Sequence, residues 1–346
     1  MAAKKNKIIP ASRWSRYVNE TLLDMRICDL GLTIEKSPVA PLIKKLYREL
    51  ENKQLIFRPH FWISDEWFCP DGVPGVSIPF FLMHARLKKL ELENMLEVEG
   101  GDPEWCMMLL RHETGHALLN AYQLTSEKPW RKIFGNPNTR YPDAYLPKPY
   151  SKRFVLNLPG WYAQSHPHED WAETFAVWLN PRSDWKKRYQ HWPALKKLKY
   201  VDELMTSLQG RKPRLRNKRT DYPVEKIRTT LREFYTSKRE RYGVDSPQFF
   251  EIDLRKLFVM HDPSIKAEKA SRYIRRVKKD LIDVVERWTG EYKYRINEVL
   301  KDMICRADAL NLRVDESRLS LMPDLAACIT MLVMNKLHSE GFHITR

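Results

Sequence analysis

The stretch "RHETGHALLNAY" (111–122) constrains the fold of this chain more than any other feature. His112, Glu113 and His116 spell H-E-x-x-H, in which two histidines four residues apart share one helical face and can reach one metal ion. Apolar residues flank the motif on both sides, so we predict a helix that is buried deep in a core. Two histidines and a glutamate are costly to bury without partners, and a metal ion would satisfy all three.

The ends of this helix are also visible in the sequence. Asp102 is a good N-cap residue, and Pro103 suits the first helical position. We therefore predict a helix from Pro103 to about Leu124.

A catalytic zinc ion needs a third protein ligand and leaves its fourth position to water. The extended pattern H-E-x-x-H-x-x-G-x-x-H is excluded, because Leu119 and Tyr122 stand where it requires glycine and histidine. The third ligand must come from another segment, and "SHPHEDWAETFAVWL" (165–179) is rich in candidates. They are His166, His168, Glu169, Asp170 and Glu173.

Glu169 and Glu173 are four residues apart and so lie on one face of a predicted helix. One carboxylate could bind the metal while the other accepts a hydrogen bond from the free ring nitrogen of a ligating histidine. Ala172 is small enough to let a neighbouring helix approach closely. The alternative is a solvated acidic face, which the flanking Trp171 and Phe175 disfavour because they indicate a buried helix.

With these residues in view, the chain resembles the gluzincin group of zinc peptidases. More closely, it is similar to the bacterial putative zinc-binding metallopeptidase family, in the stretches "RHETGH" (111–116) and "HPHEDWAETFA" (166–176). The resemblance extends to "EWFCPDGVPG" (66–75) and "GWYAQSHP" (160–167), and so covers the first 205 residues. The helical C-terminal half adds little to it.

The resemblance implies one zinc ion per chain, with His112 and His116 as ligands and Glu113 as the general base. It also implies Glu169 as the third ligand and Glu173 as the acid that supports a ligating histidine. The implied reaction is peptide hydrolysis, in which Glu113 takes a proton from zinc-bound water and delivers it to the leaving amine.

Three further residues have candidate roles. Tyr162 lies seven positions before Glu169, where lethal-factor-type gluzincins carry the tyrosine that stabilises the oxyanion; the alternative is an ordinary packed aromatic residue. Asp170 competes with Glu169 as the ligand, and its side chain points about 100° round the helix from that of Glu169. His166 and Asp170 are candidate contacts to the substrate or the transition state.

We predict an α+β fold in which a zincin-like metallopeptidase domain, mostly helical with a small sheet, precedes an all-α domain. The predicted boundaries are 1–205 for the catalytic domain, 206–222 for a basic linker and 223–346 for a helical domain of unknown role. Helices are expected at 12–29, 37–54 and 167–181, extended segments at 55–64 and 75–87, and an irregular, ordered covering loop at 129–159. The second extended segment is either an edge strand that pairs with substrate or a core strand.

Composition limits the remaining possibilities. The sequence contains no apolar run of 18 residues and no apolar leader, so we expect neither a membrane span nor a secretory signal. Its five cysteines are scattered, which favours a cytoplasmic protein without disulfides. The net charge of +16 fits a protein or peptide substrate that is acidic; a nucleic-acid partner is an alternative, but no nucleic-acid-binding motif supports it.

Two rival functions differ from a general peptidase. One is a basic binding or regulatory protein that keeps zinc as a structural element, although such a site would normally have a fourth protein ligand and no need for Glu113. The other is a short intracellular peptidase that cleaves a repressor, although such enzymes usually have a much shorter spacer than residues 117–168.

Overall fold

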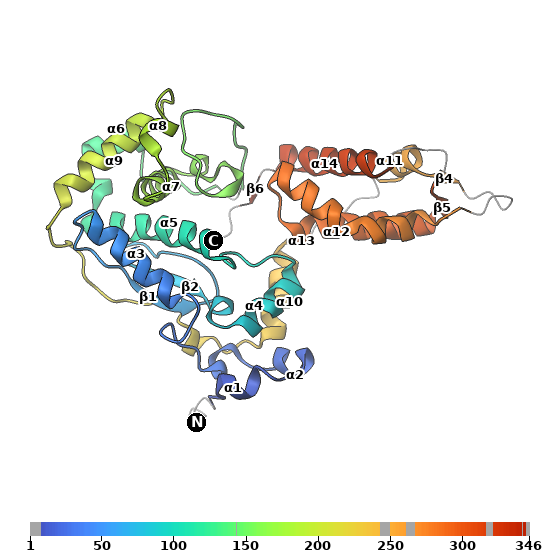
Figure 1. Ribbon diagram of the computed structural model, residues 1–346, viewed down its shortest axis with the longest axis horizontal. Coiled ribbons are helices and arrows are strands. Elements are labelled where there is room, and N and C mark those ends of the chain that lie inside the picture. The colour runs from blue at the N-terminus through green and yellow to red at the C-terminus, as the bar shows by residue number, and fades with distance from the viewer. Residues whose placement is uncertain are drawn as a thin grey trace. The chain divides into compact units, whose positions relative to one another are not determined.

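The computed structural model describes residues 8–142, 144–242, 250–260, 267–315, 321–340 and 342–343. Contacts between residues divide the chain into two compact units. Figure 1 shows the chain coloured by residue number from blue to red. Unit 1 contains the described residues up to 94, those from 98 to 236, and His343. Unit 2 contains residues 95–97 and the described residues from 237 to 342.

The described chain is mostly helical and contains a small sheet, as predicted. The sheet with the longest strands belongs to unit 1 and consists of β1 (His60–Ser64) and β2 (Gly75–Pro79). These strands are parallel, with Phe61 opposite Val76 in the register. At this level the α+β prediction is confirmed, while the zincin-like fold and the predicted domain boundaries stay predictions.

The N-terminal segment differs from its prediction. In place of one helix over 12–29, the chain forms α1 (Ala11–Trp14), α2 (Asn19–Leu23) and the 3-10 helix η1 (Ile27–Leu30). The indole of Trp14 donates a hydrogen bond to the carbonyl of Leu30 at 3.0 Å, whereas a straight helix would hold those residues about 24 Å apart. Val18, which the apolar spacing placed on the buried face, is 69% exposed.

The next helix, α3 (Ala40–Asn52), confirms the prediction for that segment, but both extended segments are shorter than predicted. Residues 80–83 form the 3-10 helix η2 (Phe80–Met83), which is followed by α4 (Ala85–Met95). All five residues of β2 are buried, and Ser77 bridges to Phe68 on the side away from β1. Of the two readings of this segment, the core strand is therefore favoured over a substrate-binding edge.

The helix that carries the H-E-x-x-H motif, α5 (Pro103–Tyr122), lies beside α7 (Pro167–Leu179) in unit 1 (Figure 1). The Asp102 carboxylate accepts hydrogen bonds from the backbone N–H groups of Glu104 and Trp105, which confirms the predicted start of α5. Between these helices lie η3 (Leu124–Ser126), α6 (Lys128–Phe134), β3 (Ala144–Tyr145) and η4 (Pro159–Gln164).

The prediction of irregular structure over 129–159 is wrong at its beginning, where α6 forms. Pro129 occupies the first turn of α6, where proline is tolerated because its missing N–H group would have no partner in the helix. The buried side chains of Trp130 and Phe134 then fix the helix against α7.

Unit 1 continues through α8 (Trp185–Arg188), α9 (Leu195–Leu208), η5 (Val224–Lys226) and the start of α10 (Leu231–Tyr242). Residues 210–222, here called the basic strap, form neither helix nor strand, and residues 219–222 lie along β1. Side chains of three alternate β1 residues hydrogen-bond to strap carbonyls: His60 to Arg219 at 2.9 Å, Trp62 to Asp221 at 2.9 Å and Ser64 to Tyr222 at 2.7 Å. The segment predicted as a linker is thus attached to unit 1.

Unit 2 is built from α11 (Phe250–Leu257), α12 (Ala270–Thr289), α13 (Lys293–Ala309) and α14 (Leu321–Glu340). It also contains a short antiparallel pair, β4 (Val259–Met260) with β5 (Leu312–Arg313), which the all-α prediction did not include. Another two-residue strand, β6 (Phe342–His343), follows α14. The core of unit 2 is apolar, with Leu281, Val285, Ile296 and Leu300 fully buried on α12 and α13.

None of the helices that the structure describes combines the length and the apolar character needed to span a bilayer.

Candidate metal centre

Helix α5 carries the motif through the interior of unit 1. His112 is 2% exposed and Glu113 is 8% exposed, while His116 is partly buried. The preceding Arg111 is also buried, and its guanidinium forms two hydrogen bonds of 2.8 Å with the carboxylate of Glu49 on α3. This two-point ion pair fixes α5 against α3 directly beside the motif.

Helix α7 approaches α5 very closely, and glycine makes this possible. A Cβ atom on Gly115 would lie 3.0 Å from the Cα atom of Ala172 and 3.3 Å from the Cβ atom of Phe175. The indole of Trp171 donates to the carbonyl of Gly115 at 2.8 Å. The close approach predicted at Ala172 is confirmed. Its partner Gly115 could have been found from the sequence. A glycine inside a helix lowers stability by about 1 kcal/mol relative to alanine, so its presence there indicates a packing requirement.

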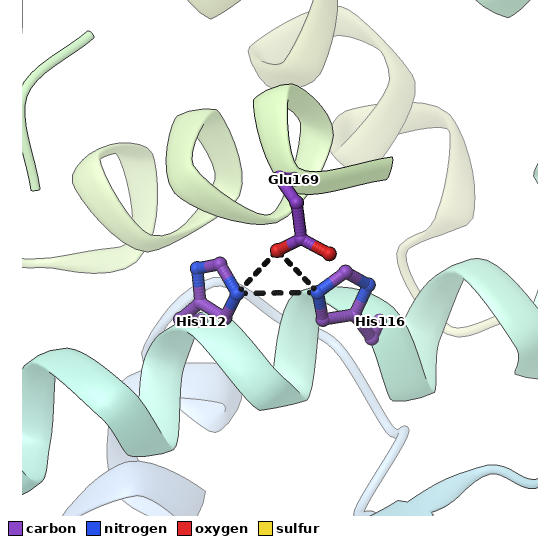
Figure 2. Close-up of side chains that lie close together, drawn as sticks. All are labelled: His112, His116 and Glu169. Carbon is purple, nitrogen blue, oxygen red and sulfur yellow. Dashed lines mark hydrogen bonds and ion pairs between the residues drawn. The ribbon is translucent and has the colours of Figure 1, made fainter. Parts of the chain in front are cut away.

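The close approach brings together His112, His116 and Glu169, the group that could hold a metal ion (Figure 2). Nε2 of His112 lies 3.0 Å from Oε2 of Glu169 and 3.1 Å from Nε2 of His116. Nε2 of His116 lies 3.2 Å from the same oxygen of Glu169. Among the described residues, this is the group whose donor atoms converge in this way.

The other carboxylate on α7 orients a histidine of this group. Oε1 of Glu173 lies 2.8 Å from Nδ1 of His112, and Glu173 is fully buried. An ionised carboxylate only accepts hydrogen bonds, so Nδ1 of His112 is the donor and Nε2 can carry a lone pair toward Glu169.

The three converging atoms fit a zinc ion. Tetrahedral ligands about 2.1 Å from zinc lie about 3.4 Å from one another, close to the spacing of 3.0 to 3.2 Å found here. Two imidazole nitrogens and a carboxylate oxygen are also a ligand set that zinc prefers. Lone pairs this close together need a cation between them, and either a proton or a metal ion can fill that place.

The pKa values in the site reflect this need. Burial opposes protonation of His112, but the hydrogen bonds and charges of Glu169 and Glu173 outweigh it and raise the pKa of His112 well above its usual value. Burial likewise disfavours the charged form of Glu169, but the nearby imidazoles of His116 and His112 hold its pKa well below the usual range. The site therefore favours a carboxylate beside a cation.

Glu113 lies next to this group without being part of it. Burial raises the pKa of Glu113, while the imidazoles of His112 and His116 oppose that rise. No hydrogen bond to the Glu113 carboxylate is found within the described part of the chain, unlike Glu169 and Glu173. Its position suits a group that exchanges a proton rather than one that holds a structural contact.

Three tyrosines line the same site. The ring of Tyr162 lies 5.7 Å from that of His112, and burial followed by the charges of Glu169 and Glu113 raises the pKa of Tyr162 well above its usual value. Its hydroxyl therefore stays protonated and can donate. Tyr141 donates to Oε1 of Glu169 at 2.8 Å, and Tyr145 donates to the carbonyl of Gly160 at 2.8 Å.

The remaining predicted residues lie near the group but are engaged elsewhere. Glu169, rather than Asp170, reaches the histidines; Asp170 is buried and pairs with Lys197 at 2.6 Å. His166 caps α7 by accepting a hydrogen bond from the backbone N–H of His168, and its other ring nitrogen contacts the carbonyl of Thr139 at 2.8 Å.

Several contacts of the site were not predicted from the sequence. Tyr141, which belongs to the predicted covering loop, is a direct partner of Glu169. Asn157 and the backbone N–H of Leu158 both donate to Glu173 at 2.8 Å. These residues belong to irregular segments, where no periodicity signals which side chain reaches the site.

Comparison with known protein families agrees with this site. Residues 106–199 match the model of the family described as "putative zinc-binding metallo-peptidase". The family resemblance is confirmed for this segment. The matched segment contains both motifs and every residue of the converging group. Residues 66–75 lie outside it, so the resemblance there stays a prediction. No curated protein and no solved structure matches the chain significantly.

Proposed function

We propose that this protein is a zinc-dependent peptidase of the gluzincin type, which hydrolyses peptide bonds in a protein or peptide substrate. The observation that carries the proposal is the convergence of His112, His116 and Glu169, with the buried Glu113 beside them. A match to a zinc-binding metallopeptidase family over residues 106–199 supports it. We retain the predicted cytoplasmic location as part of the proposal.

The number of ligands favours catalysis over a purely structural role. The converging group has three members in the described chain, and a structural zinc site usually has four protein ligands. A zinc ion bound here would supply Lewis acidity, which lowers the pKa of a water molecule and polarises a carbonyl group.

The residues of the chain then have distinct tasks. Glu113 accepts a proton at its carboxylate when water attacks the scissile carbonyl, and donates it to the nitrogen of the leaving amine. The hydroxyl of Tyr162 donates a hydrogen bond to the carbonyl oxygen as negative charge develops there. Glu173 holds the ring of His112, and burial of the group excludes bulk water.

The basic strap supports an acidic protein as the substrate. Its lysine and arginine side chains are exposed: Arg211, Lys212, Arg214, Arg216, Lys218 and Arg219. Two of them form ion pairs within the chain, Arg214 with Glu127 and Arg219 with Asp221. The strap thus presents an excess of positive charge to solvent, which attracts acidic partners at low ionic strength.

The decisive experiment compares the peptides that the wild type and Glu113→Gln produce from a cell extract. We expect Glu113→Gln to lower the rate of cleavage about 10²- to 10⁴-fold, because it removes the general base, while metal analysis still finds one zinc ion per chain. Glu104→Gln is the matched control, since Glu104 is an exposed residue of the same helix. Acidic residues should be enriched around the cleaved bonds.

Two results would contradict this proposal. Equal cleavage by the wild type and Glu113→Gln would remove Glu113 from the reaction. Zinc bound by the wild type without any cleavage would favour the alternative of a basic, zinc-containing binding or regulatory protein. Loss of zinc from Glu169→Ala would then still identify Glu169 as a zinc ligand.

A further inference from the structure

The side chain of Asn157 reaches the metal centre from the segment that precedes η4. Its Nδ2 atom donates a hydrogen bond of 2.8 Å to Oε1 of Glu173. The same oxygen lies 2.8 Å from Nδ1 of His112. The other oxygen of Glu173 accepts a hydrogen bond of 2.8 Å from the backbone N–H of Leu158. Asn157 thus reaches the metal group through Glu173, which in turn contacts His112.

The hydrogen-bonding capacity of these groups fixes their directions. An amide NH₂ group can only donate, so Oε1 of Glu173 accepts from Asn157 and presents its remaining acceptor capacity to His112. Nδ1 of His112 must then donate, which leaves Nε2 of His112 as the atom that faces Glu169. The three hydrogen bonds also leave the Glu173 carboxylate little freedom to rotate.

The segment that carries Asn157 is itself held in place. Val155 is 1% exposed, and the backbone N–H of Leu156 donates to the hydroxyl of Tyr189 at 3.0 Å. The backbone N–H of Ala194 donates to the carbonyl of Lys152 at 3.1 Å. These contacts fix the backbone before Asn157, and the hydrogen bond from Leu158 to Glu173 fixes it after Asn157. The Asn157 side chain is therefore already in place when the site binds a ligand.

We propose that Asn157 is a positioning residue for the metal centre. It holds the Glu173 carboxylate in the orientation in which that carboxylate fixes both the ring and the tautomer of His112, and so prepares Nε2 of His112 to bind zinc. This inference rests on the proposed function only in that His112 binds a metal ion. Peptide cleavage is not required for it.

The test is the affinity for zinc, measured by competition with a chromogenic chelator on the full-length chain. Asn157→Asp keeps the shape of the side chain but replaces the donor with a second carboxylate, so we expect the affinity to fall about 10- to 100-fold. Asn157→Ala removes the donor without adding charge and should lower the affinity about tenfold. Asn138→Asp is the matched control, because Asn138 is exposed and has the same chemistry.

Two measurements separate positioning from a general loss of structure. The cobalt-substituted protein reports the geometry of its ligands through visible absorption bands, which should change in Asn157→Asp and remain unchanged in Asn138→Asp. Circular dichroism of the metal-free proteins should be the same for all variants. Affinity that falls only in step with a loss of helical signal would overturn the proposal.

The proposal also fails if Asn157→Asp and Asn157→Ala bind zinc within twofold of the wild type and give the wild-type cobalt spectrum. That outcome leaves the peptidase proposal intact, provided that Glu113→Gln still abolishes cleavage. If both Asn157 variants lose affinity and the wild type cleaves no peptide, the positioning role stands and the peptidase proposal fails. A wild type that binds no zinc overturns both.

Discussion

The contact between α5 and α7 in unit 1 encloses ionisable side chains, whereas the contact between α12 and α13 in unit 2 encloses mainly apolar ones. His112, Glu169 and Glu173 are each at most 5% exposed. In unit 2, Leu281 and Leu300 occupy comparable buried positions. Both helix pairs are closely packed, so they differ in the chemical character of the side chains that are buried between them.

This difference shows which part of the molecule is organised for chemistry. Burying ionisable groups costs several kcal/mol per charge unless each one is paired, and apolar residues of similar size would often be at least as stable. The polar cluster of unit 1 is therefore poorly explained by stability alone, while the core of unit 2 needs no other explanation. Substitutions in each region should separate the two kinds of burial.

The largest effect on stability is expected in the apolar core. Leu300→Ala removes a fully buried side chain from α13 and should lower the free energy of unfolding of unit 2 by about 2–5 kcal/mol. Hydrogen exchange of the α12 and α13 amides measures this loss. Zinc affinity should be unchanged, because none of the atoms in the converging group belongs to unit 2. A matching loss of zinc affinity would contradict the separation of the two regions.

A smaller loss of stability is expected at Gly115, with a clear effect on the metal centre. In Gly115→Ala the new Cβ atom meets the backbone of Ala172 at 3.0 Å, so α5 and α7 must move apart. We expect a loss of about 1–3 kcal/mol in stability and weaker zinc binding, because the histidines and Glu169 lie on opposite sides of this contact. Thermal unfolding with and without zinc measures both effects.

The matched control for that experiment is Gly210→Ala. Gly210 has a φ of +65° but nothing within 4 Å of its added Cβ atom, so any cost there comes from the backbone conformation. Zinc affinity should fall in Gly115→Ala and not in Gly210→Ala. Equal zinc affinity in both variants would show that the close helix contact does not control the site.

The same comparison explains how much could be predicted from the sequence. The histidine pair and the α7 carboxylates were accessible because helical periodicity places residues four apart on one face, whatever surrounds the helix. The choice of Glu169 over Asp170 came from the family resemblance. The roles of Tyr141 and Asn157 depend on how an irregular segment returns to the helices, and no local pattern encodes that path.

The N-terminal segment shows a different limit. Trp14, Leu22 and Met25 do have the spacing of an apolar helical face, and all three are buried. Trp14 and Leu22 nevertheless lie on separate short helices and Met25 lies after the second, because the chain folds back to form the hydrogen bond from Trp14 to Leu30. Periodicity therefore identified these three buried residues but was wrong about Val18 and about the element. Long-range contacts decided the rest.

The effect that depends most on pH concerns Glu97, an ionisable group of unit 2. Burial, followed by the negative charge of Glu286, raises the pKa of Glu97 to about 7, while Lys293 and Lys238 oppose the rise. The folded state therefore holds this proton more tightly than the unfolded state, whose pKa is near the ordinary 4.5. The associated stability is fully present below about pH 4.5 and is lost as the pH rises toward 7.

Glu97→Gln tests this exception to the mainly apolar character of unit 2. The neutral amide cannot ionise, so the variant should lack the part of the pH dependence that Glu97 contributes between about 4.5 and 7. It should be more stable than the wild type at pH 8, where the partly buried carboxylate is charged, and similar at pH 4. Hydrogen exchange of the α12 amides at both pH values provides the measurement. A variant that is less stable than the wild type at pH 8 would mean that the charged carboxylate, through Lys293, stabilises unit 2.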